Sequence, residues 1–311
     1  MKVKSFFVIS RWEYLPSAIN EVGIPALLAL AAVPFSSYFL AMAAAGLWVW
    51  WGGHFIGSHI NCLADYEVDK LYKKYLAAAV DDIGKTTIKK IIRYESIFIS
   101  LAIFTAAVAF KRPMLAIFWL SGLFLAFAYS CKPLHFKSRR LMNPLTLGLV
   151  LYICPMFFVY HLITLSFSIF STIIILLFTF QMVPMFLMDE ISDYEEDKQC
   201  GLRNPCVFYG RKKVISWSLV IYFCATVGTA GYIILKYGLN NLLSRLIFLG
   251  AVLFFGFVLL DFYRLYRLAS QYETTGAEEV LSKLKKSVIT PVWLMGSGTA
   301  TLLLLFISPG R

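Results

Sequence analysis

Charged residues are scarce in this chain. Only 15% of its 311 residues are Asp, Glu, Lys or Arg, whereas 59% are hydrophobic, and the mean hydropathy is +0.71. Soluble globular domains have about 25% charged and about 45–50% apolar residues, so this balance excludes an ordinary soluble protein. Lipid is therefore the expected solvent of the fold.

Cysteine is also sparse, and its pattern excludes two common ways of stabilising a small domain. The six cysteines are scattered along the chain without paired spacing. No Cys/His spacing typical of a zinc site occurs. Four of the cysteines fall in segments expected on the cytoplasmic side, where thiols stay reduced. We therefore expect neither disulfide bonds nor bound zinc.

Acidic residues are outnumbered, 18 against 29 Lys and Arg, which gives a net charge of +11. The cations flank hydrophobic runs and form no soluble basic domain, so we expect membrane topology to explain them and no nucleic-acid partner. When Lys and Arg are assigned to alternate sides of a membrane, only five of the 29 fall opposite the N-terminus. The positive-inside rule then places the N-terminus in the cytoplasm or its organellar equivalent.

Hydrophobic runs, by contrast, are long and numerous. A transmembrane helix needs about 20 predominantly apolar residues. Nine stretches qualify, roughly 17–36, 38–60, 88–110, 113–130, 143–162, 166–188, 214–235, 242–263 and 287–307. Residues 1–15 interleave charged and aromatic residues, which predicts a short interfacial helix and not a signal peptide. The sequence predicts an all-α membrane protein with nine transmembrane helices, forming a single domain over residues 1–311.

Carboxylates concentrate after the second and the sixth of these stretches. The same four-residue spacing occurs there twice, 128 residues apart, as Asn61, Asp65 and Asp69 and then as Asp189, Asp193 and Asp197. This duplication predicts two four-helix repeats followed by a ninth helix. Because long loops commonly carry function, residues 61–87 and 189–213 are predicted to be functional loops on the cytoplasmic side.

Each of these trios predicts a stripe of oxygen ligands, because residues i, i+4 and i+8 share one face of a helix. Crowded carboxylates repel one another at a membrane boundary, and a divalent cation would relieve that repulsion. Mg²⁺ prefers oxygen ligands and commonly joins one or two protein carboxylates to substrate phosphates. The stripes therefore predict a site for Mg²⁺ and a diphosphate. The alternative, solvated loop charges, is disfavoured by the duplicated spacing.

Basic residues near the stripes are candidates for contacting the diphosphate. Lys132 and Lys137 follow the fourth hydrophobic stretch, and Arg203 follows the second stripe. We expect Lys132 and Arg203 to bind phosphate oxygens. Topology and contact with lipid headgroups better explain the neighbouring cations Arg139, Arg140, Arg211, Lys212 and Lys213.

Two polar residues lie deeper along the second predicted helix, on the face that carries Asp65. His54 and Ser58 are predicted to bind a second substrate or to take its proton. A hydrogen bond to a neighbouring helix is the alternative explanation for an intramembrane histidine. His59 points away from this face and is expected to be structural.

On the sixth predicted helix, three apolar residues lie near the direction of Asp193. These residues are Phe178, Met182 and Phe186. They are predicted to line a channel for an apolar chain attached to the diphosphate. Ordinary helix–helix packing is an equally open explanation for this apolar face.

Together these elements resemble the signatures of the UbiA superfamily of intramembrane prenyltransferases. The first signature, N-x-x-x-D-x-x-x-D, stands here as residues 61–69. The second, D-x-x-x-D-x-x-x-D with a G-x-x-T-like tail, stands as residues 189–197 followed by Gly201 and Asn204, where Thr is more usual. A Tyr-Ser-x-Lys-Pro element stands as residues 129–133. The resemblance covers essentially the whole chain and implies the nine-helix layout of that superfamily.

The resemblance also implies a reaction and residue roles. In this family Mg²⁺ helps to ionise an isoprenyl diphosphate, and the prenyl group passes to an aromatic or lipid-like acceptor. By analogy the core ligands of Mg²⁺ and diphosphate are Asp65, Asp69, Asp193 and Asp197, supported by Asn61 and Asp189. Lys132 and Arg203 are assigned to the phosphates and Tyr129 to a hydrogen bond beside them. The expected catalytic residues are Asp65, Asp193, Lys132 and Tyr129.

The expected partners are an isoprenyl diphosphate, a hydrophobic acceptor and the lipid bilayer, with no obligate protein partner. A terpene cyclase that acts without an acceptor remains an alternative, because it also begins with ionisation. A transporter is disfavoured, because the carboxylates lie at one surface and not at mid-bilayer. Many quinone-forming members follow the first signature with Arg-Pro, whereas residues 70–80 here contain none. This departure argues against a standard ubiquinone or menaquinone assignment.

Overall fold

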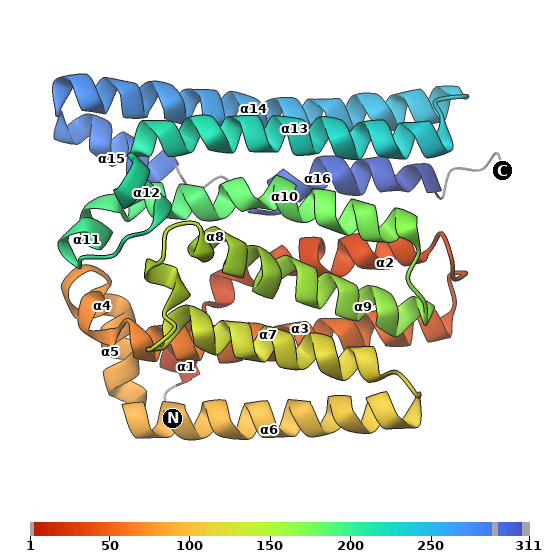
Figure 1. Ribbon diagram of the computed structural model, residues 1–311, viewed down its shortest axis with the longest axis horizontal. Coiled ribbons are helices and arrows are strands. Elements are labelled where there is room, and N and C mark those ends of the chain that lie inside the picture. The colour runs from red at the N-terminus through yellow and green to blue at the C-terminus, as the bar shows by residue number, and fades with distance from the viewer. Residues whose placement is uncertain (1–2, 288–291, 307–311) are drawn as a thin grey trace.

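The computed structural model describes residues 3–287 and 292–306, and helices dominate that part of the chain, which contains no β-strand (Figure 1). Within the described residues, seven helical segments are long and apolar enough to cross a membrane. Six are single helices: α3 (Ser37–Ala64), α6 (Lys85–Ala109), α7 (Pro113–Ser130), α10 (Ile169–Ser192), α13 (Arg211–Tyr237) and α14 (Leu242–Thr275). The seventh is the continuous segment Met142–Thr164, which consists of α8 (Met142–Leu147), η4 (Gly148–Ile153) and α9 (Cys154–Thr164). An all-helical fold with multiple membrane spans is therefore what the structure gives.

The outer faces of these helices are apolar. Val108 on α6, Leu235 on α13 and Leu253 on α14 all have more than half of their side-chain surface exposed. Helices that hydrogen-bond their own backbone and expose apolar side chains are the structures that lipid tolerates. The helix interiors pack together through a continuous cluster of buried apolar residues that reaches from the N-terminal segment to the last helix.

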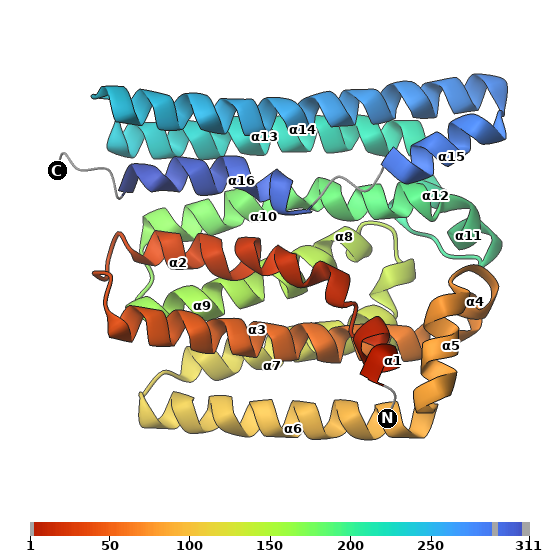
Figure 2. The same ribbon diagram turned by 180° about the vertical axis from the view of Figure 1, so that it is seen from behind.

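The first predicted span is irregular, and the last is described only in part. The first divides into η1 (Trp12–Ser17), η2 (Ile19–Gly23) and α2 (Ile24–Ala29), and the last contains α16 (Val292–Leu303) and η5 (Leu304–Phe306). Part of predicted stretch 287–307 lies outside the described residues. Pro16 and Pro25 lack the amide hydrogen that a regular α-helix uses, which favours the irregular start. Even so, α2 lies beside α9 and α16 beside α10 (Figures 1 and 2).

Most of the short helices gather at one end of the helix bundle, on the left of Figure 1. They are α1 (Val3–Ile9), α4 (Tyr66–Tyr72), α5 (Lys74–Ile83), η3 (Phe136–Ser138), α11 (Tyr194–Gln199), α12 (Pro205–Tyr209) and α15 (Glu278–Ser287). Connections at the opposite end are brief, as at 110–112 and 238–241. The two predicted functional loops therefore lie at the same end.

The N-terminal helix α1 packs against α5 in this end region. The Ser5 hydroxyl donates a 2.6 Å hydrogen bond to a carboxylate oxygen of Asp82, next to the end of α5. After α1 the chain turns at Arg11, whose backbone is left-handed (φ 51°), and enters η1. This turn directs the next residues along the inside of the bundle.

Candidate active site

Both carboxylate stripes lie where a long helix bends into a short one. Helix α3 ends at Ala64 and α4 begins after Asp65, whose φ and ψ are −90° and 2°. Helix α10 ends at Ser192 and α11 begins after Asp193, whose φ and ψ are −89° and 3°. The two positions 128 residues apart thus share one backbone conformation.

Because of these bends, the three residues of each stripe do not lie on the one straight helix that the sequence predicted. The four-residue hydrogen-bond spacing nevertheless persists across them. The Asp65 amide donates to the Asn61 carbonyl, the Asp69 amide to the Asp65 carbonyl and the Asp197 amide to the Asp193 carbonyl, each at 2.8 Å. Each trio therefore keeps a helical relation while its last member turns away from the axis of the long helix.

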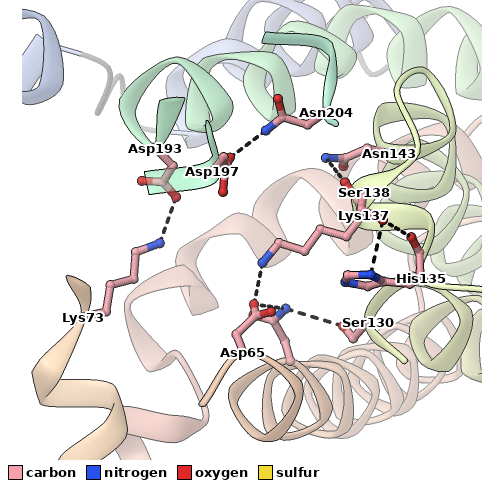
Figure 3. Close-up of polar contacts among 11 residues, drawn as sticks. Asp65, Lys73, Ser130, His135, Lys137, Ser138, Asn143, Asp193, Asp197 and Asn204 are labelled. Carbon is pink, nitrogen blue, oxygen red and sulfur yellow. Dashed lines mark hydrogen bonds and ion pairs between the residues drawn. The ribbon is translucent and has the colours of Figure 1, made fainter. Parts of the chain in front are cut away.

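Two lysines form ion pairs with the aspartates at the bends (Figure 3). Lys73 Nζ lies 2.8 Å from Asp193 Oδ2, and Lys137 Nζ lies 2.5 Å from Asp65 Oδ2. Lys73 belongs to the loop that follows the first stripe, so its ion pair joins the two acidic segments. Since opposite charges attract strongly where water is partly excluded, these pairs hold the carboxylates in place.

Asparagine side-chain amides hydrogen-bond to one aspartate of each stripe. Asn61 Nδ2 donates to Asp65 Oδ2 at 2.9 Å, and Asn204 Nδ2 donates to Asp197 Oδ2 at 2.6 Å (Figure 3). The Asn204 side-chain oxygen accepts from the Val207 amide at 2.9 Å and so caps α12. A cap fixes which end of the amide faces Asp197, and this gives a local reason for asparagine at this position.

Two of the carboxyl groups are poorly solvated. Burial, followed by the neighbouring Asp65 carboxylate, raises the pKa of Asp69 to about 6. Burial and the Asp193 carboxylate likewise raise the pKa of Asp197 to about 6, against the opposing effect of Lys137. The negative charge at these positions is therefore costly, and a bound cation would favour the ionised forms.

A cavity of about 360 Å³ opens between these two acidic segments and runs into the bundle. Seven of the predicted site residues line it: His54, Ser58, Asn61, Tyr129, Phe186, Asp193 and Asp197. Lys73, Lys137, Asn143, Glu190 and Asn204 line it as well. Carboxylates, amides and lysines thus stand at one end of a chamber whose remaining wall is largely apolar.

Two predicted phosphate contacts lie elsewhere. Lys132 and Arg203 are exposed, and neither lines the cavity. The Arg203 carbonyl instead accepts a 2.7 Å hydrogen bond from the Arg140 amide. Lys137, five residues after Lys132 in the same loop, reaches the site because the chain turns at His135 (φ 43°) before η3. The sequence thus predicted the loop, and within that loop the structure places Lys137, not Lys132, at the cavity.

Lys73 was missed altogether at the sequence level. It lies four residues after Asp69 and so continues the spacing of the first stripe, which is the signal that could have found it. The conformation of Lys73 (φ −119°, ψ 56°) separates α4 from α5. The side chain is one-third exposed at the mouth of the cavity.

The apolar face predicted on the sixth span divides in two. Phe186 lines the cavity, whereas Phe178 and Met182 are fully buried and do not line it. Phe178 packs edge-on against Tyr152 of η4, with 5.9 Å between ring centroids. Helix packing, the alternative explanation, therefore describes Phe178 and Met182. The side chain of Asp189 lies outside the described residues.

The histidines of the second span differ in surroundings. His54 lines the cavity, stacks on Trp50 and lies 3.3 Å from the Arg11 carbonyl. His59 is fully buried between Ser10, at 2.9 Å, and Glu95, at 3.4 Å. His59 thus connects α1, α3 and α6, which agrees with a structural role.

The donor set fits Mg²⁺. Asn61 from the end of α3 and Asp193 and Asp197 from the end of α10 line the chamber, and oxygen is the ligand atom that Mg²⁺ prefers. Asp65 and Asp69, two of the predicted core ligands, do not line it, although Asp65 accepts a hydrogen bond from Asn61. In the part of the chain that the structure describes, no three His, Cys, Asp or Glu side chains converge into a complete protein-only cation site. Mg²⁺ commonly retains water molecules and shares substrate phosphate oxygens, so the protein need not supply all of its ligands.

A model of the UbiA prenyltransferase family matches residues 22–275, most of the chain. The chain belongs to the UbiA prenyltransferase family. The resemblance predicted from the sequence signatures is therefore confirmed, and the carboxylate ends described above fall inside the matched region of this UbiA-family protein. A search of curated protein sequences finds no match.

Solved structures agree on the UbiA fold. A UbiA homolog from Archaeoglobus fulgidus bound to GPP and Mg²⁺ is 17% identical, with a TM-score of 0.61 over 96% of this chain and 99% of that chain. A structure described as digeranylgeranylglyceryl phosphate synthase is 16% identical, with a TM-score of 0.59 over 98% of this chain and 97% of that chain. At these identities the likeness shows the fold alone.

Proposed function

We propose that this protein is a Mg²⁺-dependent intramembrane prenyltransferase that ionises an isoprenyl diphosphate and transfers the prenyl group to a hydrophobic acceptor. The main support is that two helix bends contribute polar side chains to one largely apolar cavity. Asn61 comes from the first bend, where it hydrogen-bonds to Asp65, and Asp193 and Asp197 come from the second. Family membership and the fold shared with a UbiA homolog bound to GPP and Mg²⁺ agree with this reaction.

In this proposal the oxygen ligands of Mg²⁺ are Asn61, Asp65, Asp69, Asp189, Asp193 and Asp197. The metal would supply Lewis-acid stabilisation of the negative charge that develops on the departing diphosphate. Lys73 and Lys137 would exchange part of their attraction for aspartate for hydrogen bonds to phosphate oxygens. Tyr129, on the cavity wall, would hydrogen-bond beside them. Aromatic walls such as Trp119 would exclude water from the allylic cation and stabilise it.

The finer architecture is part of the same proposal. We infer nine helices in two four-helix repeats plus one, within a single domain, with the acidic end on the cytoplasmic side. Besides the paired bends, two glycines support the repeat: Gly84 (φ 88°) precedes α6, and Gly210 (φ 90°) precedes α13. Both glycines follow the short helices of an acidic loop. The positive charge in the loops supports the sidedness.

The decisive test is release of diphosphate from geranyl, farnesyl and geranylgeranyl diphosphate by purified protein with Mg²⁺, with and without hydrophobic acceptors. Asp65→Asn and Asp193→Asn should abolish turnover while leaving the protein monodisperse. Glu67→Gln is the matched control, because Glu67 lies between the two ligands on α4 and is largely exposed. Full activity of either aspartate variant would refute the site. A cyclised product formed without acceptor would identify a terpene cyclase instead.

A further inference from the structure

The N-terminal segment forms part of the cavity wall, which a simple membrane anchor would not do. Arg11, Tyr14, Ser17 and Glu21 line the cavity at spacings of three and four residues, so one side of η1 and η2 faces inward. Segment η2 contacts α3, α9 and α16, and Figure 2 shows the path from α1 to α2.

Glu21 is the unusual member of this group. Only 3% of its surface is exposed, and Ser17 and Tyr152 hydrogen-bond to its carboxyl group. Within the described residues, Oε2 has no hydrogen-bond partner. A buried polar atom without a partner costs about 1–3 kcal/mol, so it calls for an explanation. A substrate group that donates a hydrogen bond would provide one.

The surroundings of Glu21 restrict what that group can be. The wall beyond the acidic end is mainly apolar, with Val49, Phe118 and Phe158 among its residues. The group must donate a hydrogen bond to a carboxyl oxygen that has no partner among the described residues, and it must belong to a molecule that fits a mainly apolar wall. A neutral hydroxyl group on an apolar molecule meets both conditions.

We propose that Glu21 binds the acceptor by accepting a hydrogen bond from its hydroxyl group and removes that proton during transfer. This inference rests on the proposed prenyl transfer. The allylic C–O bond breaks, and its electron pair leaves with the diphosphate. The acceptor oxygen forms a new bond to the allylic carbon, and its proton passes to the Glu21 carboxylate. The products are a prenyl ether and diphosphate, so no other reactant is required.

The carboxylate has two roles here that a structural residue would lack. It selects acceptors that carry a free hydroxyl, since the burial of an unpaired carboxylate penalises an acceptor without one. It also acts as a general base, an effect that commonly contributes about 10²–10⁴-fold to the rate. Ser17 and Tyr152 then act as positioning residues that hold the carboxyl group toward the cavity.

The test compares two reactions of the same purified protein. One is transfer from geranyl diphosphate to a long-chain alkylphenol or a long-chain primary alcohol, with the methyl ether of each as the hydroxyl-free probe. The other is Mg²⁺-dependent release of diphosphate without acceptor. Glu21→Gln should reduce transfer by about 100-fold or more, while acceptor-free release stays within about twofold of wild type. Glu273→Gln, at an exposed position on α14, is the isosteric control and should preserve both reactions.

Other outcomes would overturn the inference. Transfer by Glu21→Gln at the wild-type rate would remove Glu21 from the reaction, and equal loss of both reactions would make it structural. Transfer to the methyl ethers, or to none of the hydroxyl compounds, would refute the acceptor class. Wild-type protein that releases no diphosphate with Mg²⁺ would refute the proposed function itself, and the inference with it.

Discussion

At the scale of single residues, the site is built from opposite charges that satisfy one another across the cavity mouth. Lys73 and Lys137 each bind an aspartate at a helix bend. These lysines are one-third exposed and about one-quarter exposed, so solvent weakens both pairs. Pairs of this strength position the carboxylates. They are also weak enough for the lysines to turn to phosphate oxygens while a divalent cation binds the carboxylates.

The two lysines of the loop after α7 provide a matched comparison. Lys137→Met should raise the dissociation constant for geranyl diphosphate in the presence of Mg²⁺ by about tenfold, since a hydrogen bond to a charged group contributes about 1.5–3 kcal/mol. Lys132→Met should change it by less than about twofold, because Lys132 is exposed outside the cavity. Isothermal titration would measure both. The reverse order of effects would restore the assignment made from the sequence.

The raised pKa values of Asp69 and Asp197 predict a pH dependence. Both carboxyls hold protons more tightly in the folded protein than in the unfolded chain, so metal-free protein should gain stability as the pH falls from about 7 to about 4. Bound protons compete with cations. The rise in melting temperature produced by Mg²⁺ should therefore be smaller at about pH 5.5 than at about pH 7.5. Na⁺ at equal ionic strength controls for screening, and an equal Mg²⁺ effect at both pH values would contradict the prediction.

At the scale of helices, the sequence predicted the long spans well because hydropathy reports directly on contact with lipid. It failed where helices continue past the apolar region. Helix α14 runs to Thr275, 12 residues beyond the predicted limit of 263, because Arg264, Arg267 and their neighbours are good helix formers although polar. Spacing alone also could not predict which part of the apolar face of α10 lines the cavity. Phe178 and Phe186 share that face, but neighbouring helices bury Phe178, whereas Phe186 borders the cavity.

The signatures predicted the acidic end, and the family assignment that rests on them is confirmed. The residues that contact these aspartates could not be predicted from spacing. Asn204 is selected by both a helix cap and Asp197, and Lys137 reaches the site only through a left-handed residue in the loop. Glu21 could not be predicted as a wall residue either. Hydropathy treats residues 17–36 as one span, whereas prolines, the 3₁₀-helix η1 and the π-helix η2 make its start irregular.

The contact between α14 and α16 depends on a glycine. A Cβ atom added at Gly298 would lie 2.3 Å from Cε1 of the Phe255 ring. Gly298→Ala should therefore destabilise the protein by about 1–3 kcal/mol, the usual cost of overpacking. Gly256→Ala on α14 is the control, because a Cβ there meets nothing within 4 Å. Thermal unfolding in detergent would compare them, and equal melting temperatures would show that α16 does not pack closely on α14.

At the scale of the whole molecule, the two ends of the bundle differ in construction. One end carries the short helices, the acidic bends and the cavity mouth, and the other carries brief connections. Lys73 from the first half forms an ion pair with Asp193 from the second half, so this ion pair between the halves lies at the end that carries the short helices. Substrate entry and metal binding would therefore take place from one face of the membrane.

The proposed sidedness can be tested with thiol reagents in sealed vesicles. Cys200, in the loop after α11, should react with a membrane-impermeant maleimide from the cytoplasmic face. In a variant where the other cysteines are replaced by alanine, Lys111→Cys should react only from the opposite face, because residue 111 lies in the connection between α6 and α7. Labelling of both positions from the same face would refute the proposed orientation.

The N-terminal segment has a consequence for protein engineering. It follows α1 along the inside of the bundle and supplies Tyr14, Ser17 and Glu21 to the cavity, yet it contributes none of the aspartates. If Glu21 binds the acceptor as proposed, acceptor choice and diphosphate binding would be encoded in different stretches of the chain. Exchanging the first thirty residues between family members is therefore a compact way to transplant acceptor preference, and deleting them would leave the chamber open to lipid.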